Sequence, residues 1–227
     1  MVDYKPKRIT LFAGHYGSGK TNIAVNFALK LRGNGDSVKV VDLDIVNPYF
    51  RTKDSADVLN KAGIELISPS FANTNVDLPA LPQEVYGVVG KQSFKTVMDI
   101  GGDDRGAYAL GRYTPSILDE NDYEMIFVAN FFRPLTKTPK EALEVMREIE
   151  CACKIPFTAI INNSNLGGDT TADDIESTAE KIDELQKLSG IPVIFTTVRK
   201  DISGVRNYRG ELFPIELQGK YFDIKEI

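Results

Sequence analysis

The residues best suited to chemistry lie near the N-terminus, in the run Gly-His-Tyr-Gly-Ser-Gly-Lys-Thr at positions 14–21. Its spacing fits G-x-x-x-x-G-K-[ST], the phosphate-binding pattern known as the P-loop. We expect Lys20 to reach the β- and γ-phosphates of a nucleotide and Thr21 to hold Mg²⁺. The predicted nucleotide-binding residues of this segment are Gly14, His15, Tyr16, Gly17, Ser18, Gly19, Lys20, Thr21 and Asn22.

The sequence on either side of this run has the pattern that a P-loop needs. Residues 8–13 form a mostly apolar stretch typical of a buried strand, and residues 21–32 have apolar side chains at helical spacing. The loop should therefore lie at a helix N-terminus, where unpaired backbone N–H groups and the helix dipole favour an anion. Gly17 and Gly19 would let the backbone curl around a phosphate group.

Acidic residues follow two further apolar stretches. Asp99 ends the stretch 94–100, the place of a metal-supporting Walker-B aspartate, and Gly101-Gly102 follows it. Gly102 could contact a γ-phosphate through its backbone N–H. Asp42 and Asp44 are two residues apart, so a strand would direct both carboxylates to one face. Since like charges so close favour a nearby cation, the expected metal ligands are Thr21, Asp42 and Asp99, with Mg²⁺ as the ion.

The whole chain alternates between strand and helix patterns. Expected strands cover residues 8–13, 37–44, 64–68, 94–100, 123–130, 157–161, 191–198 and 212–217; expected helices cover 21–32, 54–62, 83–89, 105–118, 139–151 and 171–188. This order predicts an α/β fold: a mostly parallel sheet with helices on both faces, in a three-layer sandwich. We expect a single domain over residues 1–227, with its ligand at the carboxyl ends of the strands.

Composition excludes several other classes of protein. A net charge of −5 argues against a broad nucleic-acid surface, and the chain has neither a long apolar run nor a signal-peptide pattern, so we expect a cytoplasmic protein without a direct membrane anchor. The two cysteines, Cys151 and Cys153, are too few for a disulfide framework; packing at a helix end, a shared metal site and a redox pair remain open. The single histidine, His15, disfavours a zinc site built on histidines.

Together, the P-loop, Val-Val-Asp-Leu-Asp at 40–44 and Asp-Ile-Gly-Gly-Asp at 99–103 resemble the MinD/ParA branch of the SIMIBI class of P-loop ATPases. The resemblance covers residues 8–200. It implies that Asp42 contacts the Mg²⁺ shell, that Asp44 activates water, and that Asp103 is a switch aspartate. With Lys20, these three make up the expected catalytic set.

One position departs from that family. Its members carry a lysine directly after the first P-loop glycine, which contacts the nucleotide of a second subunit, whereas this chain has His15. A neutral imidazole can still donate a hydrogen bond, but it carries no fixed charge. Arg51 and Arg105 are alternative sources of an arginine that stabilises the transition state.

The nucleotide base should lie against the polar run Asn-Asn-Ser-Asn at 162–165. Related GTPases have Asn-Lys-x-Asp here, and their aspartate accepts two hydrogen bonds from guanine. An asparagine in its place weakens that preference and permits adenine. We expect Asn162 and Asn163 to contact the base and Arg199 to border it; the alternative is that 162–165 is only a polar turn.

These features predict an Mg²⁺-dependent ATP-binding protein, a slow ATPase that acts as a switch on a protein or cofactor partner, with a homodimer among the options. Binding of ATP and ADP would reshape residues 45–53 and 100–113 differently. Two alternatives remain: an ATP-dependent small-molecule kinase or ligase that uses loops 69–82 and 131–138, and a nucleotide-dependent binding module without significant turnover.

Overall fold

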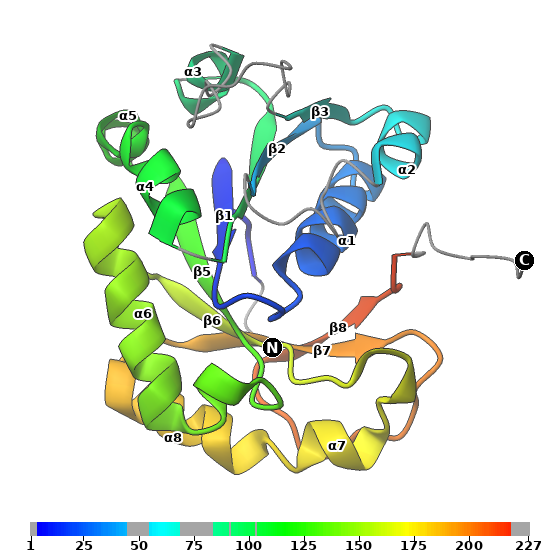
Figure 1. The fold of residues 1–227 in the computed structure, drawn as a ribbon. Helices are drawn as coiled ribbons and strands as arrows, with labels where there is room; N and C mark the ends of the chain where they lie inside the picture. Colours follow the sequence, from blue (N-terminus) through cyan, green and yellow to red (C-terminus); the bar gives the residue numbers. More distant parts are fainter. Residues whose placement is uncertain (1–3, 45–54, 69–83, 91, 103, 219–227) are drawn as a thin grey trace, which may run out of the picture.

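The centre of the molecule is an eight-stranded sheet in which every neighbouring pair is parallel (Figure 1). The computed structural model describes residues 4–44, 55–68, 84–90, 92–102 and 104–218. The strand order is β3-β2-β4-β1-β5-β6-β7-β8. The strands are β1 (Ile9–Ala13), β2 (Val38–Leu43), β3 (Glu65–Ile67), β4 (Lys95–Ile100), β5 (Tyr123–Ala129), β6 (Ala159–Asn162), β7 (Val193–Arg199) and β8 (Glu211–Ile215).

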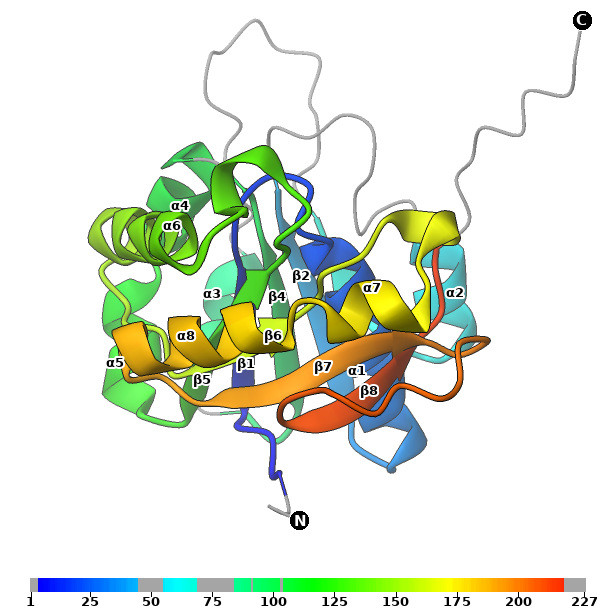
Figure 2. The ribbon, with the colours of Figure 1, turned by 90° about the horizontal axis from the view of Figure 1, so that it is seen from below.

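Helices connect these strands and cover both faces of the sheet (Figures 1 and 2). They are α1 (Lys20–Gly33), α2 (Ala56–Lys61), α3 (Glu84–Val89), α4 (Asp104–Gly111), α5 (Thr114–Glu120), α6 (Pro139–Cys153), α7 (Ala172–Glu176) and α8 (Ala179–Ser189). The short 3-10 turns Pro134–Thr136 and Gly167–Asp169 lie in loops. None of the helices in the described ranges is long and apolar enough to cross a membrane.

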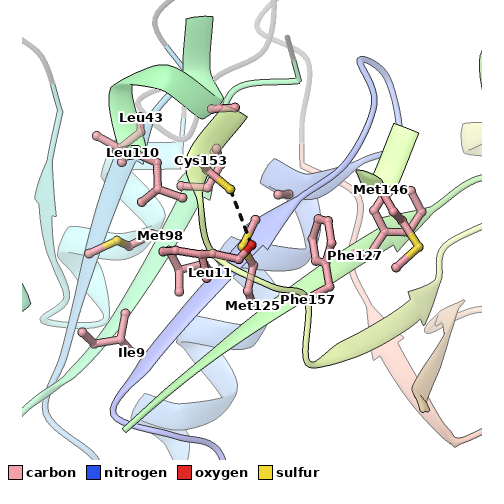
Figure 3. Close-up of a cluster of buried hydrophobic side chains, with 14 of the residues drawn as sticks. Ile9, Leu11, Leu43, Met98, Leu110, Met125, Phe127, Met146, Cys153 and Phe157 are labelled. Carbon is pink, nitrogen blue, oxygen red and sulfur yellow. Dashed lines mark hydrogen bonds between the residues drawn. The ribbon is translucent and has the colours of Figure 1, made fainter. Parts of the chain in front are cut away.

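Two apolar clusters hold the helices to the sheet. On one face, α1 packs with α2 against alternate strand residues such as Phe12, Val40 and Val97. On the other face, side chains from α3, α4, α5, α6 and α8 meet the intervening strand residues; Figure 3 shows part of this cluster, including Leu11, Met98 and Cys153. Both faces of the parallel sheet are thus buried, as its continuous apolar strands require. The expected α/β sandwich is confirmed.

Two expected helices are each divided into two. The segment 105–118 breaks after Gly111. At the break, the ring centroids of Tyr113 and Tyr86 are 4.8 Å apart, and the Thr114 hydroxyl donates to the Cys153 carbonyl at 2.6 Å. Pro115 then lies in the first turn of α5, where its missing N–H is no loss. A proline inside the expected helix 105–118 predicts a break near its end, at Pro115, which is wrong because the break lies earlier, after Gly111.

The segment 171–188 breaks between α7 and α8. Ser177 and Thr178 donate their hydroxyl groups to carbonyls of the preceding turn, at 2.7 Å each. Such side-chain bonds compete with the helical pattern. The start of α7 is as expected, because Thr171 and Asp174 form a capping box.

The parallel topology places the carboxyl ends of all strands along one edge of the sheet. β1 lies between β4 and β5, so the loop after β1 is flanked by the segments that follow those two strands. Asp99 in β4 is the register partner of both Phe12 and Asp42. Register partners in parallel strands share a face, so Asp42 and Asp99 lie on the side that α1 covers.

Candidate nucleotide site

The P-loop occupies the turn from β1 into α1, and its backbone requires glycine at specific points. Gly17 and Gly19 have φ values of 75° and 90°, a region that side chains other than glycine rarely adopt. A Cβ atom on Gly14 would stand 2.6 Å from the Val128 carbonyl oxygen of β5. Helix α1 begins at Lys20 without a side-chain cap or an acidic residue in its first turn. Its N-terminal amides therefore suit an anion such as phosphate.

The polar groups inside this loop fit a phosphate ligand. Lys20 is buried, and its Nζ donates to the His15 carbonyl oxygen at 3.2 Å. The hydroxyl of Ser18 is buried without a hydrogen-bond partner in the described part of the chain. His15 is half-buried and has its Nδ1 3.0 Å from the Tyr16 carbonyl oxygen. An ammonium group and a hydroxyl group in one glycine-rich turn form a suitable cradle for a phosphate.

Thr21 and Asp99 meet directly beneath the P-loop. The Thr21 hydroxyl donates to Asp99 Oδ2 at 2.6 Å, and both residues are buried. Asp42 is also buried, and its Oδ1 accepts the backbone N–H of Asp44 at 2.9 Å. In the described ranges no three His, Cys, Asp or Glu residues are grouped so that they could hold a metal by themselves. These hydroxyl and carboxylate oxygens suit Mg²⁺, which usually completes its shell with water and substrate phosphate.

The segment after β4 lies against the P-loop. A Cβ atom on Gly102 would stand 2.7 Å from the Tyr16 nitrogen and 2.8 Å from Lys20 Nζ. A Cβ on Gly101 would stand 3.3 Å from Asp44 Oδ1. Glycine at position 102 lets the backbone lie this close to the P-loop, so the structure brings Gly102 to Lys20 and the adjacent Gly101 to Asp44. Asp103 and Arg51 lie outside the described residues, as does the side chain of Arg105.

Asn163 connects the P-loop to the end of β6. Its side-chain nitrogen donates to the Ser18 carbonyl at 2.6 Å, and its side-chain oxygen accepts the Thr197 hydroxyl at 2.5 Å. The asparagine nitrogen also occupies the space that a Cβ of Gly19 would need. The sequence assigned Asn163 to the base, whereas here its amide braces the loop that would hold the phosphates.

Asn162 points away from this site. Its side chain donates to Thr178 Oγ1 at 2.9 Å and accepts the Ser164 hydroxyl at 2.7 Å. Strand alternation explains the difference, because Asn162 shares a face with Ile160, which packs in the cluster of α6 and α8. The structure therefore does not bring Asn162 to the P-loop.

Arg199 and Asn22 are also engaged elsewhere. The Arg199 guanidinium donates to the Gly167 and Gly168 carbonyls at 3.0 and 2.6 Å. It also forms an ion pair with Asp201, and the hydrogen bond to that carboxylate raises the pKa of Arg199. It thus fixes the loop after β6 that we expected beside the base. The Asn22 side chain accepts the Gln218 N–H at 3.0 Å, so it holds the segment after β8 rather than facing the P-loop.

One residue in contact with the loop was missed by sequence reasoning. Arg133, in the loop after β5, donates from Nε to the Gly17 carbonyl at 2.8 Å. The sequence assigned residues 131–138 to a loop that a small-molecule kinase or ligase would use. No local motif marks Arg133; the signal that could have found it is topological, since β5 neighbours β1.

The two cysteines have different environments at the end of α6. Cys151 is exposed, whereas Cys153 is buried and its Sγ lies 3.7 Å from the Ile155 carbonyl oxygen (Figure 3). Burial raises the pKa of the Cys153 thiol above its usual value. Cys153 is therefore a packing residue of the core, as one of the open alternatives proposed.

The fold is similar to those of solved FtsY structures. The cell division protein FtsY of Thermotoga maritima has a TM-score of 0.57 at 16% identity, over 87% of this chain and 63% of that chain. FtsY of Mycoplasma mycoides has a TM-score of 0.55 at 18% identity, over 92% of this chain and 63% of that one. The signal recognition particle receptor FtsY of Elizabethkingia anophelis, in complex with GDP, has a TM-score of 0.52 at 12% identity, over 97% and 63%.

These similarities establish the P-loop α/β fold. At such identities they establish the fold alone, and the chain spans 63% of the length of each of these proteins. No protein-family model and no curated protein matches the sequence.

Proposed function

We propose that this chain binds ATP with Mg²⁺, hydrolyses it slowly and uses the bound state as a switch on a protein or cofactor partner. The observation that carries the proposal is the meeting of three elements around one turn: Lys20 inside the loop, the Thr21–Asp99 pair below it and Gly102 against Lys20. A phosphate cradle, a metal support and a backbone segment at the cradle are the parts of a nucleotide switch.

Each residue has a separate role in this proposal. Lys20 neutralises the β- and γ-phosphates, and Thr21 and Asp99 hold Mg²⁺, with Asp42 beside them in register. Mg²⁺ would supply charge neutralisation between phosphate oxygens. Asp44, whose Cα and carboxylate lie near Gly101, is the candidate that orients the attacking water. Asp103 keeps its predicted switch role.

Adenine is our proposed base because the segment after β6 carries no carboxylate from Asn162 to Gly168. Guanine needs an acceptor for its N1–H and N2–H₂ groups, and amide or apolar side chains do not match that pair of donors. A guanine nucleotide is the second candidate, since one structure of similar fold holds GDP. A competition titration with ATP and GTP separates the two.

The kinase or ligase and the binding module remain alternatives. Purified protein incubated with Mg²⁺ and ATP alone should form ADP. ADP formation without an acceptor would exclude the pure binding module, and dependence on an added acceptor would favour the kinase or ligase. The resemblance to MinD/ParA ATPases adds the proposal of an ATP-dependent homodimer, which light scattering with a non-hydrolysable ATP analogue tests.

The decisive variant is Lys20→Ala. Removing a buried ammonium from the phosphate cradle should lower ATP affinity by roughly 100-fold, since hydrogen bonds to charged groups contribute about 1.5–3 kcal/mol each. Lys140→Ala is a matched control on an exposed position of α6. Isothermal titration of both variants measures the difference. Equal ATP affinity and equal ADP formation in wild type and Lys20→Ala would refute the proposed site.

A further inference from the structure

Arg133 packs against the P-loop at Gly17. Besides the hydrogen bond from Nε to the Gly17 carbonyl, its Cδ and Cζ atoms lie 3.6 Å from where a Cβ of Gly17 would stand. The flat guanidinium group thus packs against the glycine backbone.

The loop that carries Arg133 is itself well defined. Asn130 is buried, and its side-chain oxygen accepts the Phe132 N–H at 3.0 Å. The Asn130 carbonyl accepts the Thr136 hydroxyl at 2.6 Å and the Arg133 N–H at 3.2 Å. The backbone of Arg133 is therefore fixed before any ligand binds. A pre-positioned charge stabilises a ligand or transition state with little reorganisation.

The charge of Arg133 is not committed to a carboxylate. Arg8, Arg199 and Arg209 each form an ion pair, but no ion pair between described residues includes Arg133. Its side chain is exposed, and the bond to Gly17 uses one of the five N–H donors of a guanidinium. The other donors remain available for an anion at the loop, and phosphate is an anion that a guanidinium can bind through two parallel hydrogen bonds.

We propose that Arg133 is a phosphate-contacting cation of the nucleotide site, supplied by the same chain that supplies the P-loop. The inference rests on the proposed function and deepens it. It places a positive charge beside a loop that has a histidine at the position where the resembling ATPases have a lysine that contacts the nucleotide of a second subunit. This chain would then need no partner copy to complete the charge of its phosphate site.

In the reaction, Arg133 acts through its charge and transfers no proton. The oxygen of water bonds to the γ-phosphorus, the bond from that phosphorus to the β–γ bridging oxygen breaks, and the electron pair of that bond goes to ADP. The proton of the water leaves with phosphate or to solvent. Arg133 stabilises the negative charge that collects on the oxygens during this step.

The test compares Arg133→Gln, which removes the charge, with Arg133→Lys, which keeps it. Arg147→Gln, at an exposed position of α6, is the control for loss of an arginine. Titration with ATP and ADP measures affinity, and single-turnover ADP formation measures the rate. Thermal melting checks that all variants are folded.

We expect Arg133→Gln to lower ATP affinity or the single-turnover rate about tenfold, at the lower end of the effect of a hydrogen bond to a charged group. ADP affinity should fall by less than about threefold, because ADP carries less phosphate charge. Arg133→Lys should stay close to wild type in both. Equal losses for ATP and ADP, or equal losses in the Lys and Gln variants, would assign Arg133 a purely structural role on Gly17 and overturn the inference.

The outcome for Arg133 can be separated from the outcome for the site itself. If wild-type protein binds ATP, Lys20→Ala does not, and Arg133→Gln behaves like Arg147→Gln, then the proposed function stands and only this inference fails. If wild type and Lys20→Ala both fail to bind any nucleotide, the proposed function fails first.

Discussion

Replacing Asn163 with alanine tests whether the end of β6 braces the P-loop. Asn163 is 1% exposed and donates to the Ser18 carbonyl at 2.6 Å while it accepts the Thr197 hydroxyl at 2.5 Å. Thr197 has a second acceptor, the Asn162 carbonyl at 3.4 Å, so its hydroxyl keeps a partner in the variant. The main loss is at Ser18. The variant loses two hydrogen bonds of about 1 kcal/mol each and leaves the Ser18 carbonyl without its donor. Its free energy of unfolding should therefore be about 2–3 kcal/mol lower than that of wild type.

Chemical denaturation of wild type and Asn163→Ala measures that loss, and Asn60→Ala is the matched control. Asn60 is exposed on α2, where such a change should stay within about 0.5 kcal/mol. Because a released P-loop must be ordered again when phosphate binds, ATP affinity should also fall at least about tenfold. A variant that matches Asn60→Ala in both stability and ATP affinity would refute the bracing role of Asn163.

Three other predictions concern different parts of the molecule. Gly102→Ala places a Cβ 2.7 Å from the P-loop backbone and should weaken ATP binding about tenfold, whereas Gly33→Ala meets nothing within 4 Å and should not; equal titration curves would count against the close contact. Burial raises the pKa of Glu124 above its ordinary 4.5, so the folded state retains a proton that the unfolded state releases. The free energy of unfolding of wild type should therefore fall relative to that of Glu124→Gln as the pH rises above 4.5. Denaturation at several pH values measures this difference, and a difference that does not change with pH would contradict the prediction. A thiol reagent should modify exposed Cys151 quickly and buried Cys153 only on unfolding, so two fast equivalents would show that the end of α6 opens.

The sequence predicted the sheet well because each strand has a strong local pattern. All eight expected strands are present, and β1, for example, covers Ile9–Ala13 where residues 8–13 were expected. The breaks in the two helices were not predicted. The break after Gly111 depends on a distant contact, because the Thr114 hydroxyl donates to the Cys153 carbonyl, 39 residues away. At the break between α7 and α8, the Thr178 hydroxyl donates to the Ile175 carbonyl of its own turn and also accepts the side-chain nitrogen of Asn162 from β6.

The same distinction applies to residues 162–165, which the sequence predicts to contact the nucleotide base. From the sequence, Asn162 and Asn163 were equivalent candidates for the base. The sheet separates them, because Asn162 shares the face of Ile160, which α8 covers, and Asn163 shares the face of Ile161, which α1 covers. Which face each helix covers is decided by the packing of the whole chain and not by the run Asn-Asn itself.

What the sequence determined by itself is the P-loop and the residues that we propose carry its chemistry: the glycines, Lys20, Thr21 and Asp99 near the end of β4. A local motif dictates these, because a glycine-rich turn between a strand and a helix has one useful geometry for phosphate. Tertiary structure decided what surrounds the loop. Ser18 meets Asn163 across 145 residues, and Gly17 meets Arg133 across 116. Such contacts follow from the order of β1, β5 and β6 in the sheet, and no spacing along the chain encodes them.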